Sequence, residues 1–424
     1  MTEEALALDG IRRKLVGKRL SYKEIYAIMD EIAHQRFGEV LTTYFAASGY
    51  SKGFSNEEIY YLTKAMIETG RQLHFSGIVA DKHSIGGVPG TRTTMIVVPI
   101  IAAAGFTIPK SSSRAITTPG GTADDMEVLA SVTFTEEEIY KIVEKTGGCI
   151  VWGGSVDIAP ADDALIKVEK PLSFESFDKF LVSIMAKKIA FGSNHIVIDL
   201  PYGENMKAEK LDDAETIKRK FEYLADRFKV KIKVIVHKTS EPGGRGIGPL
   251  LEAREALRVL EQDAERPKDL EREALSLAGP LLDLCLADST SSVQEKVKKE
   301  FGNGRDWAQY LLKSKHALVK MREIIKAQKG DPDITSSRLK PGKYTFEVAA
   351  KGTGQIEKLH VKNATIVAKI LGAPAQKKSG IYFNKKIGET VEKGDILYTL
   401  YSESAYHLQE AKESLLNFPL LYYA

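Results

Sequence analysis

Apolar residues follow two different spacings along the chain, and these spacings predict which segments form helices and which form strands. Up to about Gly70 the pattern is helical throughout. Ser21 with Glu24, and Ser55 with Glu58, have the spacing of capping boxes at helix N-termini. We therefore expect a first region made only of helices.

Short apolar runs alternate with helical patterns from Gly77 to about Lys238, which is typical of an α/β domain around a mostly parallel sheet. Further helices are expected from Gly248 to about Gln328, and short strands with glycine turns begin near Ile334. The expected strands are GIVADKH, FTIPK, CIVWGG, HIVIDL and VKIKVIVHK, and two of the expected helices are TMIVVPIIAAAG and TEEEIYKIVEKTGG. The predicted fold class is α/β multidomain, with a small all-helical domain, an α/β domain with a mostly parallel sheet, and a β-rich, barrel-sandwich-like C-terminal domain.

Composition limits the classes of protein that fit these patterns. The chain has 424 residues, more than one hydrophobic core usually organises, so two or three domains are expected. A formal net charge of +3 argues against a partner such as nucleic acid or a membrane surface. Cys149 and Cys285 form no CxxC pair or Cys/His cluster, so a reducing cytoplasm fits best. The acidic start and the lack of a long apolar run favour a soluble protein.

A glycine-rich stretch, KHSIGGVPGT at residues 82–91, lies between an expected strand and an expected helix. Glycines allow backbone amides to approach an oxyanion, and the helix N-terminus adds partial positive charge. Lys82, Ser84 and Thr94 would add a charge and hydroxyl donors. A tight turn without a ligand explains this stretch equally well, because it has neither the GxGxxG nor the GxxxxGK[ST] spacing.

A second stretch of the same kind, IPKSSSRAITTPGGTADDMEVLA at residues 108–130, strengthens the case for an anion site. Lys110, Arg114 and the hydroxyls between Ser111 and Thr118 supply many donors to phosphate oxygens or sugar hydroxyls. Thr122 alone would be explained as an N-cap. Two donor-rich loops after neighbouring strands, however, fit the edge at which open α/β sheets bind ligands.

These two stretches resemble the thymidine phosphorylase family, and most closely its AMP phosphorylase branch. Other matching pieces are GGCIVWGGSVDIAPADD, SIMAKKIAFG, HIVIDLPYG and GIGPLLEAREAL. The resemblance covers nearly the whole chain. It implies a helical domain that forms the dimer and is joined by hinges to an α/β domain, with the substrate cleft between them. The implied divisions are 1–70 with 160–192 for the helical dimerisation domain, 75–155 with 193–330 for the phosphate-binding catalytic domain, and 334–424 for the C-terminal domain.

The resemblance also implies roles for individual residues. Positions that match phosphate contacts are Lys82, Ser84, Thr94, Ser112 and Thr122, to which the residue pattern adds Lys110. Positions that match nucleotide contacts are Gly87, Ser113, Arg114, Ala115, Ile116, Thr117, Thr118, Thr122, Ser183 and Lys207. The candidate catalytic residues are Glu175, His83 and Lys187.

Two positions depart from the family pattern. Glu175 stands where the AMP branch has an aspartate proton donor, and it would equally serve as a carboxylate at a helix start that Ser173 caps. Val168 stands where thymidine phosphorylases have an arginine on the pyrimidine carbonyl, and the neighbouring Lys167 cannot reproduce a guanidinium fork. The second departure favours a nucleotide substrate, whose 5′-phosphate would be held by a group such as Lys207.

The implied reaction is phosphorolysis of AMP to adenine and ribose 1,5-bisphosphate, with CMP and UMP as further candidate substrates. No metal or organic cofactor is expected, and inorganic phosphate is the co-substrate. The expected partners are small molecules and a second copy of the chain in a homodimer. The AMP branch usually has an extra N-terminal domain before the helical domain, and the helical pattern here begins at the start of the sequence.

Three alternatives remain. The first is a thymidine or pyrimidine nucleoside phosphorylase. The second is a phosphoribosyltransferase, which would need magnesium, for instance at Asp124 and Asp125. The third is a biotinyl or lipoyl carrier domain, because GETVEKGDILYTLYSES has that pattern, although the turn YSESAY at residues 401–406 contains no lysine to be modified.

Overall fold

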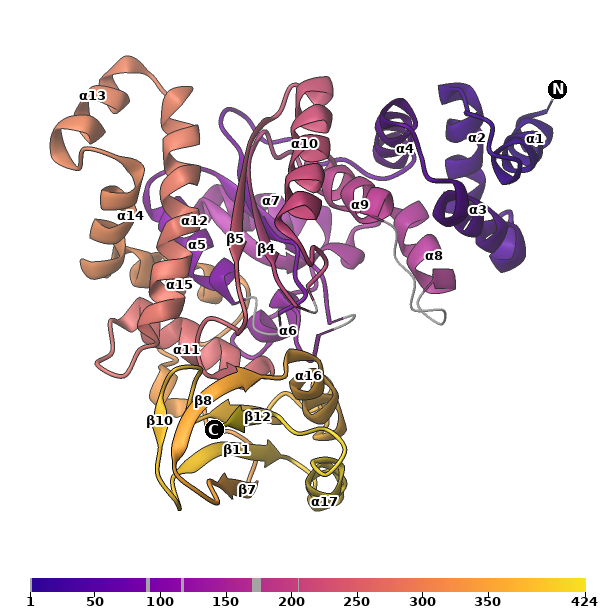
Figure 1. Cartoon of the computed structure of the whole chain (residues 1–424). Helices are drawn as coiled ribbons and strands as arrows, with labels where there is room; N and C mark the ends of the chain where they lie inside the picture. The colour runs from indigo at the N-terminus through magenta and orange to yellow at the C-terminus, as the bar shows by residue number, and fades with distance from the viewer. Residues whose placement is uncertain (1, 89–91, 116–117, 170–176, 205) are drawn as a thin grey trace.

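The computed structural model describes residues 2–88, 92–115, 118–169, 177–204 and 206–424 (Figure 1). Helices form the N-terminal part, a parallel sheet packed between helices forms the centre, and a β-rich region forms the C-terminal part. The predicted fold class is confirmed.

The N-terminal part consists of α1 (Glu3–Leu15), α2 (Tyr22–Ala33), α3 (Gly38–Lys52) and α4 (Asn56–Glu68). Both predicted capping boxes are present, with reciprocal hydrogen bonds between Ser21 and Glu24 and between Ser55 and Glu58. Two later helices, α8 (Pro160–Glu169) and α9 (Phe177–Ala190), share the apolar core of this bundle. Figure 1 shows α9 lying between α4 and the central sheet, so it borders both parts.

The central sheet contains the five strands that the sequence predicts: β1 (Ala80–Ser84), β2 (Ile108–Ser112), β3 (Gly148–Trp152), β4 (His195–Tyr202) and β5 (Lys231–Lys238). β1, β4 and β5 pair in parallel, as do β2 and β3. An isolated parallel bridge between Val79 and Thr107 brings β2 beside β1. Helices cover both faces of such a sheet, which explains the buried apolar runs of β3 and β4. All five strands therefore end at one edge.

The helices around the sheet are α5 (Thr93–Ala103), α6 (Thr122–Glu127), α7 (Glu136–Thr146), α10 (Leu211–Phe228), α11 (Pro249–Glu261), α12 (Lys268–Ala287), α13 (Ser291–Glu300), α14 (Gly304–Lys313) and α15 (His316–Ala327). α5 and α6 begin directly after the two glycine-bearing loops. Among the described residues, no helix is long and apolar enough to cross a membrane.

The C-terminal region contains β7 (Tyr344–Ala349), β8 (Gly354–Leu359), β9 (Gly380–Phe383), β10 (Thr390–Val391), β11 (Ile396–Ser402) and β12 (Leu421–Tyr423). It also has two helices, α16 (Val361–Ile370) and α17 (Ala405–Ser414), which the β-rich pattern did not predict. In α16 the buried residues Ala364, Val367 and Ala368 have helical spacing. A two-residue strand, β6 (Gly246–Ile247), leaves the central part and pairs with β9. The two parts are thus joined by backbone hydrogen bonds.

Candidate active site

A buried ammonium group lies at the end of β1 and is surrounded by hydroxyl groups. Lys82 is fully buried, and its Nζ donates to Thr93 Oγ1 at 2.6 Å and to Thr94 Oγ1 at 3.4 Å. It also donates to Ser84 Oγ. Three of the predicted phosphate contacts, Lys82, Ser84 and Thr94, therefore lie together. Thr93, which the sequence analysis did not select, makes the shorter contact of the two threonines.

A carboxylate–imidazole pair supports this ammonium group from β4 and β5. Ser84 Oγ donates to Asp199 at 2.5 Å, and His237 Nε2 lies 2.7 Å from the other Asp199 oxygen. Burial alone would raise the pKa of Asp199, but the hydrogen bond from His237 and the charge of Lys82 lower it. The same hydrogen bond raises the pKa of His237 above its ordinary value. A small cavity of about 30 Å³ lies here, lined in part by Ser84, Asp199 and His237.

A second cluster of positive charge surrounds the end of β2. Lys110 Nζ lies 3.4 Å from one oxygen of Asp81, and Lys188 Nζ of α9 lies 2.9 Å from the other. All three side chains are buried. The buried Ser112 Oγ has no hydrogen-bond partner in the part of the chain that the structure describes, so it is free to donate to an oxyanion. The negative charge of Asp81 is thus shared by two lysines, and the nearby hydroxyl of Ser112 can still donate a hydrogen bond.

His83 lies among these lysines, and this position determines its charge. Burial lowers the pKa of its imidazole well below the ordinary value, and the charges of Lys188, Lys110 and Lys82 lower it further. The imidazole is therefore neutral near pH 7. A neutral ring can donate or accept a hydrogen bond, but it is not a reservoir of an acidic proton.

Ser183, a predicted nucleotide contact, and Lys187, a candidate catalytic residue, stand on one face of α9, and a single carboxylate holds both. Asp162 Oδ2 accepts from Ser183 Oγ at 2.6 Å and from Lys187 Nζ at 2.6 Å. Asp162 itself is buried, whereas Lys187 is 29% exposed. Asp163 is more distant from Lys187, at 3.8 Å, and is 55% exposed. Asp162 is therefore the group that orients both side chains.

Lys207 and Gly87, both predicted nucleotide contacts, lie against each other. A Cβ atom on Gly87, whose φ is +99°, would lie only 3.3 Å from the Lys207 backbone nitrogen. Glycine permits both this backbone conformation and this approach. The Lys207 ammonium stands 5.0 Å from the ring centroid of Phe180 on α9. An aromatic face thus holds a lysine near the first loop.

The second loop returns onto itself before α6 begins. Asp124 Oδ2 accepts from the backbone nitrogen of Ala115 at 2.7 Å and from that of Gly121 at 3.2 Å. Arg114 forms a bidentate pair with Glu127. The aspartate therefore holds the loop and the start of α6, as a helix-capping residue would. Among the described residues, no group of three or more His, Cys, Asp or Glu side chains could hold a metal ion.

Several predicted positions lie outside the described residues or make other contacts. Glu175, Ser173, Ile116 and Thr117 fall outside the described ranges. The remaining predicted nucleotide contacts are described: Ser113 and Thr118 lie in the second loop, and Thr122 is the first residue of α6. The N-cap of that helix is Gly121 and not Thr122. Val168 packs against the bundle core, and Lys167 pairs with Glu39 of α3 at 2.8 Å.

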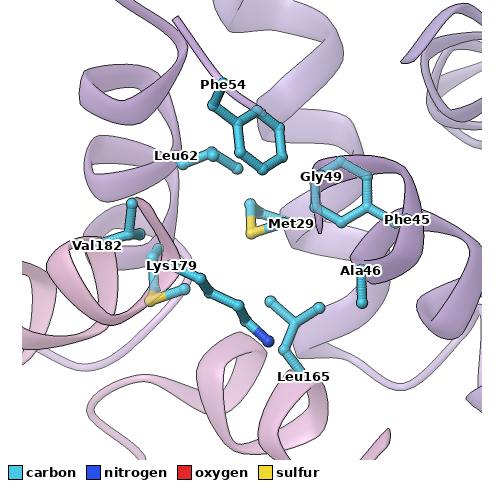
Figure 2. A pocket seen from close by; sticks show the side chains of 10 residues that line it. Met29, Phe45, Ala46, Gly49, Phe54, Leu62, Leu165, Lys179 and Val182 are labelled. Carbon is cyan, nitrogen blue, oxygen red and sulfur yellow. The ribbon is translucent and has the colours of Figure 1, made fainter. Parts of the chain in front are cut away.

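A second cavity lies within the helical bundle, between α2, α3, α4, α8 and α9 (Figure 2). Its lining includes Met29, Phe45, Phe54 and Leu165, and Lys179 is the charged residue that reaches it. Because this lining is almost wholly apolar, the cavity does not suit a phosphate or a nucleotide. The candidate site is the edge of the sheet where the two loops meet.

Besides Thr93 and Asp81, which directly adjoin predicted residues, sequence reasoning missed Asp162, Lys188, Asp199 and His237. Asp199 and His237 each lie near the end of a predicted strand, so their position at the ligand-binding edge was readable from the pattern. Asp162 and Lys188 depend on the packing of α8 and α9 against other parts of the chain. Nothing in their local sequence distinguishes them from other charged helix residues.

Comparisons with known proteins agree with this geometry. Three family descriptions match in order: "Glycosyl transferase family, helical bundle domain" at residues 8–70, "Glycosyl transferase family, a/b domain" at 76–302, and "Pyrimidine nucleoside phosphorylase C-terminal domain" at 355–417. Anthranilate phosphoribosyltransferase from Thermus thermophilus superposes with a TM-score of 0.62 at 17% identity, over 76% of this chain and 100% of that structure. At that identity the likeness shows the fold alone.

Two relatives are similar over most of their length. AMP phosphorylase from Methanocaldococcus jannaschii is 41% identical over 96% of this chain and 79% of the relative. A protein from Methylococcus capsulatus with the provisional name thymidine phosphorylase is 40% identical over 97% of this chain and 77% of the relative. This chain is therefore a pentosyltransferase that belongs to the glycosyl transferase family, in the group that contains the AMP phosphorylases.

Proposed function

We propose that this enzyme cleaves nucleoside 5′-monophosphates by phosphorolysis, with AMP as the first substrate and CMP and UMP as further candidates. The observation that carries the proposal is the buried ammonium group of Lys82 within a ring of hydroxyls, at the strand ends that also bear Ser112. This is a site for one oxyanion. Lys207, held on Phe180 near the same loop, supports a second anionic group such as a 5′-phosphate.

In this proposal an oxygen of inorganic phosphate attacks C1′ of the ribose. The bond from C1′ to the base nitrogen breaks, its electron pair goes to the base, and the base takes up a proton. The products are free base and ribose 1,5-bisphosphate. Lys82 and the hydroxyls orient the phosphate, and its negative charge stabilises the cationic ribose in the transition state. Ser183 and Lys187 would face the base.

Proton donation to the leaving base is assigned to Glu175 as a proposal. His83 is a poor candidate because its pKa lies well below the ordinary value, through burial and the neighbouring lysines. Lys187 is a weak acid, since Asp162 and Asp163 outweigh the effect of burial and raise its pKa. A carboxyl group with a proton near neutral pH would suit the task better.

A side-by-side assay of base release tests the proposal. AMP, CMP, UMP, adenosine and thymidine are each incubated with inorganic phosphate, and free base is separated by chromatography. AMP is expected to react far faster than adenosine, and Lys207→Ala should narrow that ratio by raising the KM for AMP. Thymidine reacting faster than AMP would instead favour a thymidine phosphorylase, the second candidate, which the name of one relative supports.

We further propose that the enzyme acts as a homodimer in the cytoplasm and needs no metal or organic cofactor. A dimer formed through the bundle is supported by exposed apolar side chains on α1 and α3. They are Leu15, Val40, Tyr44 and Tyr50. Hinged closure of 1–70 with 160–192 onto 75–155 with 193–330 would exclude water. Light scattering tests the dimer, and full activity in excess EDTA tests the cofactor statement.

A further inference from the structure

The C-terminal region sends one side chain to the loop that opens α6. Lys377 lies just before β9, and its Nζ is 2.8 Å from Asp124 Oδ1 and 2.8 Å from Glu127 Oε2. Its backbone carbonyl accepts from the nitrogen of Leu250 at 3.0 Å, which fixes the chain against the start of α11. Figure 1 shows α6 at the border between the central sheet and the C-terminal region.

Asp124, the residue that Lys377 contacts, closes the second loop. It accepts from Ala115 N and Gly121 N on the two sides of the loop. At this closure the backbone of Gly121 is packed on the loop, because a Cβ atom there would lie 2.6 Å from Ser113 O. Ala123 N also donates to Ser113 O at 3.3 Å. The position of Asp124 therefore sets the position of the described loop residues on either side.

Asp124 is a buried carboxylate among other acidic groups, so it needs a nearby cation to balance its charge. Asp124 is 3% exposed, and the buried carboxyl groups of Asp125 and Glu252 lie close by. Burial raises the pKa of Glu252 to about 7, and a hydrogen bond from Arg114 lowers the pKa of Glu127 to about 2. Two carboxylates, Asp124 and Glu127, are thus shared by two cations, Arg114 and Lys377.

We propose that Lys377 is a positioning residue for substrate binding: it holds Asp124 and Glu127, and thereby keeps Ser113 to Ala115 in place against Gly121 at the start of α6. The C-terminal region then takes part in the site through this one side chain as well as through β6. Loss of the ammonium group leaves Asp124 with Arg114 as its one charged partner among the described residues. It also adds net negative charge beside a site for anionic substrates. This inference rests on the proposed function for the identity of those substrates.

The test compares two cross-region ion pairs of similar exposure. Lys377→Met removes the contact to the loop. Arg245→Met is the matched control, because the hydrogen bonds and the ion pair of the Arg245 side chain with described residues all go to the C-terminal region, at Phe383, Asn384 and Glu389. The side chains of Lys377 and Arg245 are 28% and 29% exposed. For each variant we would measure kcat and KM for AMP and for phosphate, the Kd of phosphate by calorimetry, and the melting temperature.

Lys377→Met is expected to raise the KM for AMP and the Kd of phosphate about tenfold or more, since a small displacement of positioning groups is costly. Lys377→Arg should restore most of the loss, because it retains the charge and reaches both carboxylates. Arg245→Met should change both constants less than about threefold. Its melting temperature should fall by about as much as that of Lys377→Met. Equal effects of Lys377→Met and Arg245→Met on binding would overturn the inference, as would unchanged binding in Lys377→Met.

Failure of the proposed function gives a different result. If the wild type releases no base from AMP, the substrate assignment is wrong. The calorimetric Kd of inorganic phosphate still decides the inference, because it requires no turnover. A tenfold rise in this Kd in Lys377→Met but not in Arg245→Met would then support the positioning role. An unchanged Kd in Lys377→Met would refute it.

Discussion

Replacement of Asp162 by asparagine tests whether one carboxylate orients Ser183 and Lys187, the side chains of α9 that are proposed to face the base. In the structure a single oxygen of Asp162 accepts from both Ser183 and Lys187, each at 2.6 Å. Asparagine has nearly the same shape but carries no charge and has one acceptor oxygen. The amide oxygen can still accept from both groups, but the ion pair with Lys187 is lost and the hydrogen bond from Ser183 no longer has a charged acceptor.

The expected size of the effect follows from these contacts. A hydrogen bond to a charged group contributes about 1.5 to 3 kcal/mol, which is roughly tenfold to a hundredfold in an equilibrium constant. We expect kcat/KM for AMP to fall by about that factor. The KM for phosphate should change little, because the Lys82 cluster shares no direct contact with Asp162. Lys187 is partly exposed, so water can replace part of the lost contact, and the protein should remain folded.

Steady-state kinetics with each substrate varied separately would measure the change, with thermal unfolding as a check on folding. Asp163→Asn is the matched control, because Asp163 is the next residue, lies 3.8 Å from Lys187 and is 55% exposed. It should retain kcat/KM within about threefold. An unchanged kcat/KM in Asp162→Asn, or equal losses in both variants, would refute the assignment of Asp162 as the orienting group.

Three further predictions concern other parts of the site. Ser84→Ala should raise the KM for phosphate by roughly tenfold to a hundredfold while leaving the KM for AMP nearly unchanged, and equal changes in both constants would contradict a phosphate contact. Glu175→Gln should lower kcat by on the order of 10² if it protonates the base, whereas an unchanged kcat across the pH range would make it a helix-start carboxylate. The hydrogen bond to Asp199 raises the pKa of His237 above the value of the unfolded chain, so its stabilising effect is complete at low pH and is lost as the pH rises through the folded-state pKa. His237→Asn should therefore lower the melting temperature more at pH 5.5 than at pH 9, and an equal loss at both would count against the pair.

Local sequence was sufficient for most of the elements before the C-terminal region and for the places of the two glycine-bearing loops. The capping boxes at Ser21 and Ser55 depend on residues three positions apart, so their hydrogen bonds could be predicted without knowledge of the fold. β3 and β4 were recognisable because strands covered on both faces are apolar almost throughout, and β5 because its apolar residues alternate with lysines. Glycines and hydroxyls directly after two of those strands then indicated where the ligand edge would be.

Only the tertiary structure decided which charges meet at that edge. Ser84 and Asp199 are 115 residues apart in the chain, and Lys377 and Asp124 are 253 apart. Such pairs form because helices and strands pack in a particular order, and no local pattern marks one buried lysine or aspartate as the partner of another. The same limit explains why β6 escaped recognition: its two residues pair with β9, more than a hundred positions away, and a strand so short has no periodicity of its own. The residue types of the site were therefore determined locally, whereas their ionisation and orientation were determined by burial and by partners from distant parts of the chain.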